Sequence, residues 1–291
     1  MTPEEKQQIL GRLAAGDVAS LGDLNISSYG TLEQLEAVMR LVNVLKVSPL
    51  DAENVLDKMV KTLQYSELTI NFRGHRFFDE NIKERWLNVF ETGNTQHYME
   101  RRDKLEEKFF DYSNKRWQAG PKDVIDRIET YGKYNSGTNI YFEPSLRPKY
   151  GALNFARLTN GPAYFFGSSY MILKQYVKHN CTFTDTDSFT YIHDERDATT
   201  LLANYHNLHR LIVNMKEDML TVLHDIANGL FLVDKYRGYI EAQIHGDILF
   251  SRDVEKMCID NFEISSYPDI NIIKQIYEEF ARQNNIQLIF K

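Results

Sequence analysis

The sequence predicts an α+β protein in which a helical N-terminal part precedes strands that alternate with helices. Two observations carry this prediction. In residues 32–45 the apolar side chains recur at the i, i+3, i+4 spacing of an amphipathic helix. From residue 67 the period changes, because ELTINFRG alternates apolar and polar residues as a half-buried strand does. A helical lead followed by strands with interrupting helices is typical of the α+β class.

The first 65 residues are predicted to form a helical lobe. Thr2, Pro3 and Glu5 make a capping box with proline at the first helical position. The helix over residues 32–45 follows, and Ser48-Pro49 starts another. We therefore divide the chain into a lobe of residues 1–65 and a second domain of residues 66–291.

In the second domain, strands and helices are predicted in alternation after the strand at residue 67. Helices are expected at about 80–90, 98–117, 122–131, 197–212, 215–228 and 271–283. Strand-like segments occupy 149–190, 238–245 and the final IQLIF, and residues 132–147 have the composition of a long functional loop.

Composition narrows the classes of function. The 291 residues carry a net charge of −7, which argues against a nucleic-acid binder because phosphate binding needs a basic face. No apolar run approaches the ~20 residues that span a bilayer. The acidic N-terminus does not resemble a signal peptide, and Cys181 and Cys258 are expected to be small buried apolar residues. We expect a cytoplasmic protein, or one exported by a route that needs no signal peptide.

Metal chemistry is the weakest of the catalytic candidates. The common phosphate-loop, dinucleotide, zinc-protease and serine-hydrolase motifs are absent from the sequence. His206 and His209 lie three residues apart on a predicted helix, a spacing that metal ligands can use, but such pairs are more often surface residues. No metal site is predicted.

Three short segments carry the functional prediction. NFRGHR (71–76) places two arginines where a strand ends, FGSSY (166–170) places two serines at the start of a strand, and YIEAQIH (239–245) carries a carboxylate on a later strand. Arginine, serine and glutamate thus follow one another on three strands. This order resembles the R-S-E pattern of the ADP-ribosyltransferase superfamily.

A longer set of motifs resembles an uncharacterised bacterial family. These motifs are NFRGHR, FETGNTQHY, RPKYGALNF, FGSSY and EAQIHGDILFSRDVE, which together cover about residues 66–260. The superfamily resemblance implies a split mixed β-sheet core and NAD as the substrate. It also implies transfer of ADP-ribose to a target protein, in the manner of effectors that bacteria inject into host cells.

Glu241 is the predicted catalytic carboxylate. Cleavage of the nicotinamide–ribose bond of NAD develops an oxocarbenium-like centre, which a carboxylate stabilises. Arg73 is the first choice for binding the pyrophosphate, with Arg76 as the alternative and Asn71 in the same segment. The resemblance makes Ser168 or Ser169 the residue that braces the nicotinamide half of the site and hydrogen-bonds Glu241, with Ser168 preferred. Arg147 and Asn154 of RPKYGALN are predicted to face the cleft.

These motifs say less about the side chain that accepts the ADP-ribose than about the NAD site. Arginine-modifying transferases usually have a second glutamate two residues before the catalytic one, whereas this chain has Tyr239 there and Gln243 two residues after Glu241. The arginine at the first triad position favours an arginine acceptor. The alternatives are an NAD glycohydrolase, in which water is the acceptor, an inactive interaction module on the same fold, and, last, a metal hydrolase. The N-terminal helices are expected to cap the NAD cleft or to recognise the target.

Overall fold

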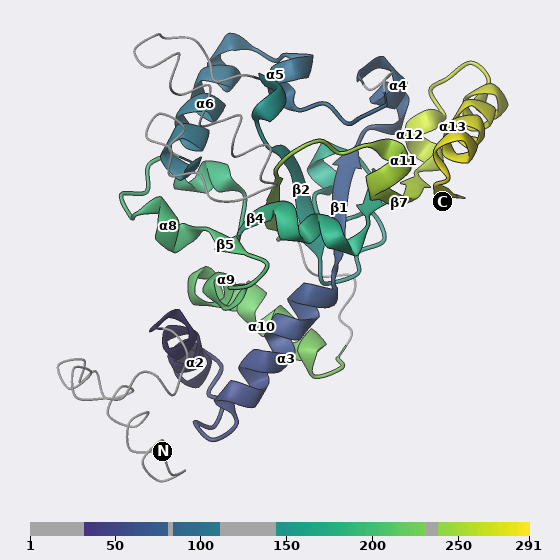
Figure 1. Ribbon diagram of the computed structural model, residues 1–291. Helices are drawn as coiled ribbons and strands as arrows, with labels where there is room; N and C mark the ends of the chain where they lie inside the picture. Colours follow the sequence, from purple (N-terminus) through teal and green to yellow (C-terminus); the bar gives the residue numbers. More distant parts are fainter. Residues whose placement is uncertain (1–31, 81–83, 111–143, 231–237) are drawn as a thin grey trace.

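In a computed structural model, the described residues, 32–80, 84–110, 144–230 and 238–291, form an α+β fold around an eight-stranded mixed sheet (Figure 1). The strand order is β5-β4-β6-β2-β1-β3-β7-β8, and of the pairings between neighbours only β7 with β8 is parallel. The strands are β1 (Glu67–Phe72), β2 (Lys149–Asn154), β3 (Ser169–Leu173), β4 (Cys181–Thr184), β5 (Ala203–Asn204), β6 (Ile240–Ile244), β7 (Val254–Ile259) and β8 (Gln287–Phe290). The predicted α+β class is confirmed.

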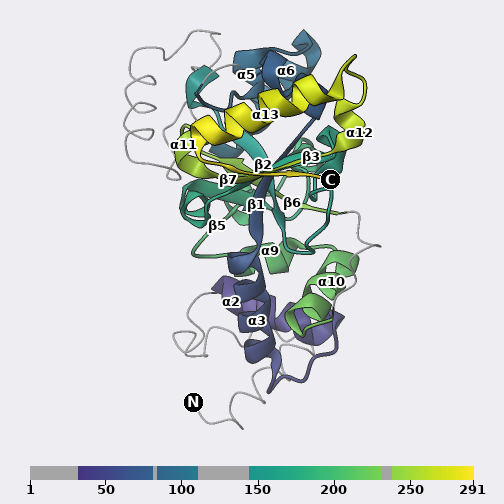
Figure 2. The same ribbon diagram turned by 90° about the vertical axis from the view of Figure 1, so that its right-hand side faces the viewer.

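The longer helices surround the sheet at two ends of the molecule. They are α2 (Leu32–Val44), α3 (Ala52–Tyr65), α6 (Gln96–Phe110), α9 (His209–Asn214), α10 (Glu217–Ala227) and α13 (Ile270–Asn284). Figures 1 and 2 both show α2, α3, α9 and α10 grouped at one end, with α6 and α13 at the opposite end. In the part of the chain described, no helix is long and apolar enough to cross a membrane.

Short helical segments connect these elements. They are η3 (Gly74–Arg76), α4 (Phe77–Glu80), α5 (Val89–Thr92), η4 (Pro144–Leu146), η5 (Tyr164–Phe166), η6 (Gln175–Asn180), η7 (Ser188–Tyr191), α8 (Ala198–Leu201), α11 (Phe250–Asp253) and α12 (Asn261–Ile264). Two of them, η3 and η5, follow or precede the strands that carry the predicted site residues. These segments therefore decide where the site residues lie.

The two faces of the sheet differ in polarity. Side chains alternate along a strand, and Ile240, Ala242 and Ile244 of β6 belong to the main hydrophobic core. That core also includes apolar residues of α2, α3, α9 and α10. Glu241 and Gln243 therefore lie on the opposite face, where they are buried as well. Glu241, the predicted catalytic carboxylate, therefore lies on a buried polar face of the sheet.

Several sequence predictions differ from the structure. The helix expected at 80–90 is wrong beyond residue 83, because Arg85 forms a β-bridge with Leu249 and Asn88 then caps the short α5. The helix expected at 197–212 is interrupted by β5, and β7 was not foreseen. The capping box at Thr2, the helix at 122–131 and most of the loop at 132–147 lie outside the described residues.

The predicted lobe packs on later parts of the chain. Helix α2 contacts α9, and α3 contacts α10. The Lys178 ammonium of η6 donates to the Ser66 carbonyl at 2.7 Å and also to that of Gln64, which fixes the end of α3 against the sheet domain. Helices from both sides of the boundary predicted at residue 65 therefore pack together. These helices share one hydrophobic core with the sheet.

Candidate active site

A pocket of about 430 Å³ opens where β1 and β2 diverge. The two strands pair only through Glu67–Thr69 with Ala152–Asn154. Beyond that point β1 continues along β3 up to Phe72, and β2 continues along β6 back to Lys149. The pocket is lined by the diverging residues of both strands, Ile70, Asn71, Phe72, Tyr150 and Gly151. The sheet is thus continuous at one end of β1 and locally opened at the other.

Glu241 lines the buried side of this pocket, with 3% of its surface exposed. Gln243 Nε2 donates to its Oε1 at 2.9 Å, and the Gln243 amide is itself oriented by Thr182 and Thr184 of β4. Burial raises the pKa of Glu241, while the nearby Arg102 charge acts in the opposite direction. A carboxyl group with a perturbed pKa in a cleft is a candidate functional group.

Arg102 of α6 is the buried cation of the pocket. Its guanidinium lies over the Tyr150 ring at 4.1 Å and over the Phe189 ring at 3.9 Å from the ring centroids. It donates to Ser188 Oγ at 3.1 Å and to Tyr98 Oη at 3.2 Å. Arg102 and Glu241 both line the pocket, and the positive charge of Arg102 favours the ionised form of Glu241.

Arg73 and Arg76 lie at the exposed edge of the same pocket. Arg73 follows the last residue of β1, and Arg76 ends the 3-10 turn η3. Both are exposed and line the pocket. The structure thus brings the predicted arginines and Glu241 to one cavity, with the guanidiniums toward solvent and the carboxylate buried.

The predicted serines do not contact Glu241. Ser169 is paired with Phe72 and shares its face of the sheet, opposite to Glu241. Its Oγ donates at 2.6 Å to Glu263, which also accepts backbone N–H bonds from Gly74, Ser168 and Ser169. Ser168 is not among the described residues that line the pocket.

Asn71 lines the pocket, but its amide is fully engaged. Its Nδ2 donates to the carbonyls of Asn160 at 2.7 Å and Gly167 at 2.9 Å, and its Oδ1 accepts from Ala163 N at 3.2 Å. These bonds hold the segment that carries the exposed Phe165 and Phe166, which line the pocket. Asn71 therefore shapes the pocket rather than offering its amide to a ligand.

Arg147 and Asn154 are both engaged in internal contacts. Arg147 is buried and pairs with Glu106 at 2.9 Å and with Asp103. Asn154 Oδ1 accepts from Leu158 N at 2.8 Å. Neither is among the residues that line the pocket in the described part of the chain. Their role there is to hold α6 and the turn after β2.

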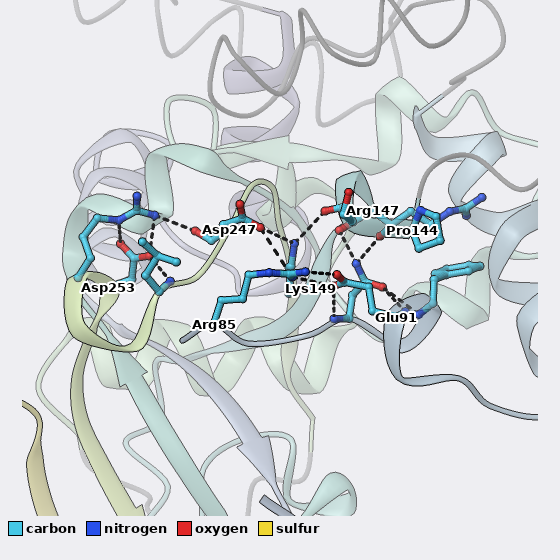
Figure 3. A network of polar contacts seen from close by, with 12 residues as sticks. Arg85, Glu91, Pro144, Arg147, Lys149, Asp247 and Asp253 are labelled. Atoms are coloured by element: carbon cyan, nitrogen blue, oxygen red, sulfur yellow. Dashed lines mark hydrogen bonds and ion pairs between the residues drawn. The ribbon is translucent and has the colours of Figure 1, made fainter. Parts of the chain in front are cut away.

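A polar network fixes the rim of the pocket next to α5 (Figure 3). The Asp247 carboxylate lies 3.8 Å from both Arg85 and Lys149, and Arg85 pairs with Glu91. Glu91 accepts from Asn88 N at 3.0 Å, and Asn88 Nδ2 donates to the Arg147 carbonyl at 3.2 Å. The network ties three of the sequence motifs together and positions Asn88, which lines the pocket.

Other candidates from the sequence lie elsewhere. His206 is exposed in the turn before α9 and His209 is buried at the start of that helix, so the two do not share a helical face. Cys181 and Cys258 are buried free thiols, as expected. Arg102, which lines the pocket, and Ser188, which accepts a hydrogen bond from it, were not predicted from the sequence. The apolar pattern gave no sign of Arg102, and Ser188 was placed in a strand-like segment although Asp187 caps a short turn there.

The comparison with curated proteins finds no match. A domain described as "Protein of unknown function (DUF3626)" is found at residues 95–204. The matched segment contributes Tyr98, Arg102 and Tyr150 to the pocket and also contains Ser188, whereas Arg73 and Glu241 lie outside it. Over these residues, which include the RPKYGALNF and FGSSY motifs, the chain is similar to this family of unknown function.

Proposed function

We propose that the protein is a mono-ADP-ribosyltransferase that binds NAD in the pocket between β1 and β2 and transfers its ADP-ribose to a target protein. The observation that carries the proposal is the buried Glu241 carboxylate in a cavity whose exposed edge carries Arg73 and Arg76. The volume of about 430 Å³ falls within the range of small-molecule sites, about 300–1,000 Å³.

The position of Glu241 suits cleavage of a glycosidic bond. As nicotinamide leaves, positive charge develops on the ribose, and a carboxylate in a water-poor site stabilises that charge more strongly than it would in water. The Gln243 amide fixes one carboxylate oxygen. The other oxygen is then the one to accept a hydrogen bond from a ribose hydroxyl or a proton from the acceptor.

The exposed arginines suit the pyrophosphate of NAD. Guanidinium groups bind phosphate oxygens in a bidentate manner. Since the chain has a net charge of −7, an anionic substrate needs local positive charge at its site. Phe165 and Phe166, both exposed at the pocket, offer aromatic faces for the nicotinamide or adenine ring.

The acceptor in this proposal is an arginine of a protein from a host cell, with the chain acting as a bacterial effector. Tyr239 lines the pocket two residues before Glu241, where arginine-modifying enzymes usually have a second glutamate. Proton removal from the acceptor therefore falls to Glu241 itself. NAD is a substrate here, and the proposal requires no metal.

The test is labelling of proteins in a host-cell lysate with biotinylated NAD. The wild-type protein should label one or a few proteins, and Glu241→Gln should label none, since the amide keeps the shape of the site and removes its charge. Glu255→Gln is the matched control, because Glu255 is an exposed strand glutamate outside the pocket lining. Equal labelling by wild type and Glu241→Gln would refute the assignment.

Two other outcomes separate the alternatives. Release of nicotinamide without any labelled protein would identify an NAD glycohydrolase, in which water takes the place of the acceptor. A lack of NAD binding in calorimetry would identify an interaction module on the same fold.

A further inference from the structure

Tyr239 brings a buried hydroxyl to the pocket that has no hydrogen-bond partner among the described residues. The residue lines the pocket and has 9% of its surface exposed. Its Oη is buried, and no described residue forms a hydrogen bond with it. Burying a hydroxyl without a hydrogen bond costs free energy, and a phenylalanine at this position would avoid that cost. The packing of the described chain therefore does not explain why residue 239 carries a hydroxyl.

Tyr239 lies on the same wall of the pocket as Glu241. It directly precedes β6, and side chains two residues apart on an extended chain point to the same side. Tyr239 forms a small apolar cluster with Ala152 and Ala163. Ala152 is the residue of β2 that is paired with Glu241, and Ala163 lines the pocket. The hydroxyl and the carboxylate are therefore neighbours on the buried wall.

The Tyr239 hydroxyl keeps its proton and can donate it in a hydrogen bond. Burial, followed by the charges of Glu241 and Asp187, raises the pKa of Tyr239. Neither carboxylate accepts a hydrogen bond from the hydroxyl in the described structure. A protonated phenol has one O–H to donate. Tyr239 therefore offers a bound ligand a donor that no described residue uses.

A second polar atom without a partner belongs to the same pocket lining. Arg102 Nε is buried and forms no hydrogen bond within the described part of the chain, although the other two guanidinium nitrogens donate to Ser188 and Tyr98. Buried polar groups without a hydrogen bond are rare in folded proteins. Two unused donors on residues of one pocket indicate that it binds a polar ligand rather than an apolar one.

We infer that Tyr239 is a binding residue whose hydroxyl donates a hydrogen bond to an oxygen of the ribose on the nicotinamide side of NAD, the ribose that Glu241 contacts. The inference rests on the proposed function, because it assigns Tyr239 to the same pocket and the same substrate. The depth of the residue favours the ribose over the pyrophosphate. Glu241 and Tyr239 are buried, whereas Arg73 and Arg76, which are assigned to the pyrophosphate, are exposed.

The test is binding of ADP-ribose and of ADP to Tyr239→Phe, measured by calorimetry. ADP-ribose contains the second ribose, and ADP lacks it. Tyr239→Phe should bind ADP-ribose about 3–10-fold more weakly than the wild type, as expected for the loss of one hydrogen bond between neutral groups. It should bind ADP with the wild-type affinity. Wild-type affinity for ADP-ribose would overturn the inference, and so would equal losses for both probes, because the hydroxyl would then contact a part that the two share.

The stability of the same variant gives a second reading that needs no ligand. Tyr239→Phe should have a urea midpoint at or above that of the wild type, because it removes a polar group without a partner. Tyr277→Phe is the matched control. The Tyr277 hydroxyl is also buried but donates to the Gly74 carbonyl at 2.7 Å, so its loss should lower the midpoint. An equally lowered midpoint for Tyr239→Phe would overturn the inference, because the hydroxyl would then have a partner within the chain.

The outcomes also separate this inference from the proposed function. A wild-type protein that binds neither ADP-ribose nor ADP would refute the NAD proposal, and the assignment of the ribose with it. A wild-type protein that releases nicotinamide from NAD, together with a Tyr239→Phe variant that binds ADP-ribose normally, would leave the proposed function standing and refute only the role of Tyr239.

Discussion

At the scale of single residues, the proposed chemistry depends on whether the Glu241 carboxyl group is protonated or ionised. Burial raises its pKa, and the charge of Arg102 together with the hydrogen bond from Gln243 acts in the opposite direction. The net direction is upward. A fraction of the protein therefore carries a neutral Glu241 in a pH range where an exposed glutamate would be fully ionised.

The first prediction follows from the raised pKa of Glu241. NAD cleavage requires the ionised carboxylate, so kcat should fall as the pH decreases through the raised pKa of Glu241. The acid limb of the profile should thus lie above 4.5, the ordinary value for glutamate. Steady-state rates of nicotinamide release from pH 4 to 9, in about half-unit steps, measure this limb. A rate that stays constant from neutral pH to 4.5 would contradict the assigned role.

The second prediction concerns Glu263, the carboxylate that accepts the hydrogen bonds of Gly74, Ser168 and Ser169. Glu263→Ala should lower the free energy of unfolding by about 3 kcal/mol, since it leaves several N–H and O–H donors without an acceptor. Urea denaturation measures the change. Glu255→Ala, at an exposed strand position, should change it by less than about 0.5 kcal/mol.

The effect of Glu263→Ala should depend on pH in a defined direction. Burial acts to raise the pKa of Glu263, but its hydrogen bonds outweigh burial and lower it. A carboxyl with a lowered pKa in the folded state stabilises the protein above its ordinary pKa and loses that contribution as the pH falls through the lowered value. The difference between Glu263→Ala and wild type should therefore shrink below pH 4.5. A difference that grows in acid would contradict this account.

Residue identities in the site were partly predictable from sequence. Glu241, Arg73 and Arg76 were found because each follows or lies on a strand with a clear apolar alternation, so their face or end of the strand was known. The serine was not, because the choice between Ser168 and Ser169 depends on strand register. The register is set by the pairing of Ser169 with Phe72, which places Ser169 on the face opposite to Glu241.

At the scale of elements, the divergence of β1 from β2 creates the pocket. Gly151 lies where the strands separate, and a Cβ at this position would come within 2.5 Å of the Thr69 carbonyl oxygen. The two backbones can approach so closely only because residue 151 has no side chain. The alternation of apolar and polar residues along a strand does not show where two backbones come this close. The place where β1 and β2 separate was therefore not predictable from the sequence.

The third prediction tests this contact. Gly151→Ala should force β1 and β2 apart and lower the free energy of unfolding by about 1–3 kcal/mol, as overpacking does. Because Gly151 lines the pocket, the same change should weaken NAD binding. Chemical denaturation and calorimetry measure the two effects. A variant with wild-type stability would show that the strands are not in close contact at this point.

At the scale of the whole molecule, the helices of the N-terminal part and the strands share one hydrophobic core. Leu41 of α2 and Leu63 of α3 are fully buried in it, together with residues of α9 and α10. The sequence predicted the helical character of this part from its apolar spacing. It did not predict that α9 and α10 would complete the group, because that packing depends on residues more than 150 positions away.

The fourth prediction is that the described fold unfolds as one unit. Leu41→Ala should lower the free energy of unfolding by about 2–5 kcal/mol. Circular dichroism, which reports mainly on helices, and tryptophan fluorescence should show coincident transitions, since Trp86 packs against the same core. An earlier loss of the helical signal with unchanged fluorescence would instead indicate an independent helical lobe.

The most direct test of the central claim is nicotinamide release from NAD by the purified protein, without any target protein. If Glu241 stabilises the developing charge on the ribose, the wild-type protein and Glu255→Gln should release nicotinamide at a slow but equal rate, through water as the acceptor. Glu241→Gln should reduce that rate by about 10²-fold or more, as loss of a charge-stabilising group does. Wild-type rates from Glu241→Gln would contradict the account.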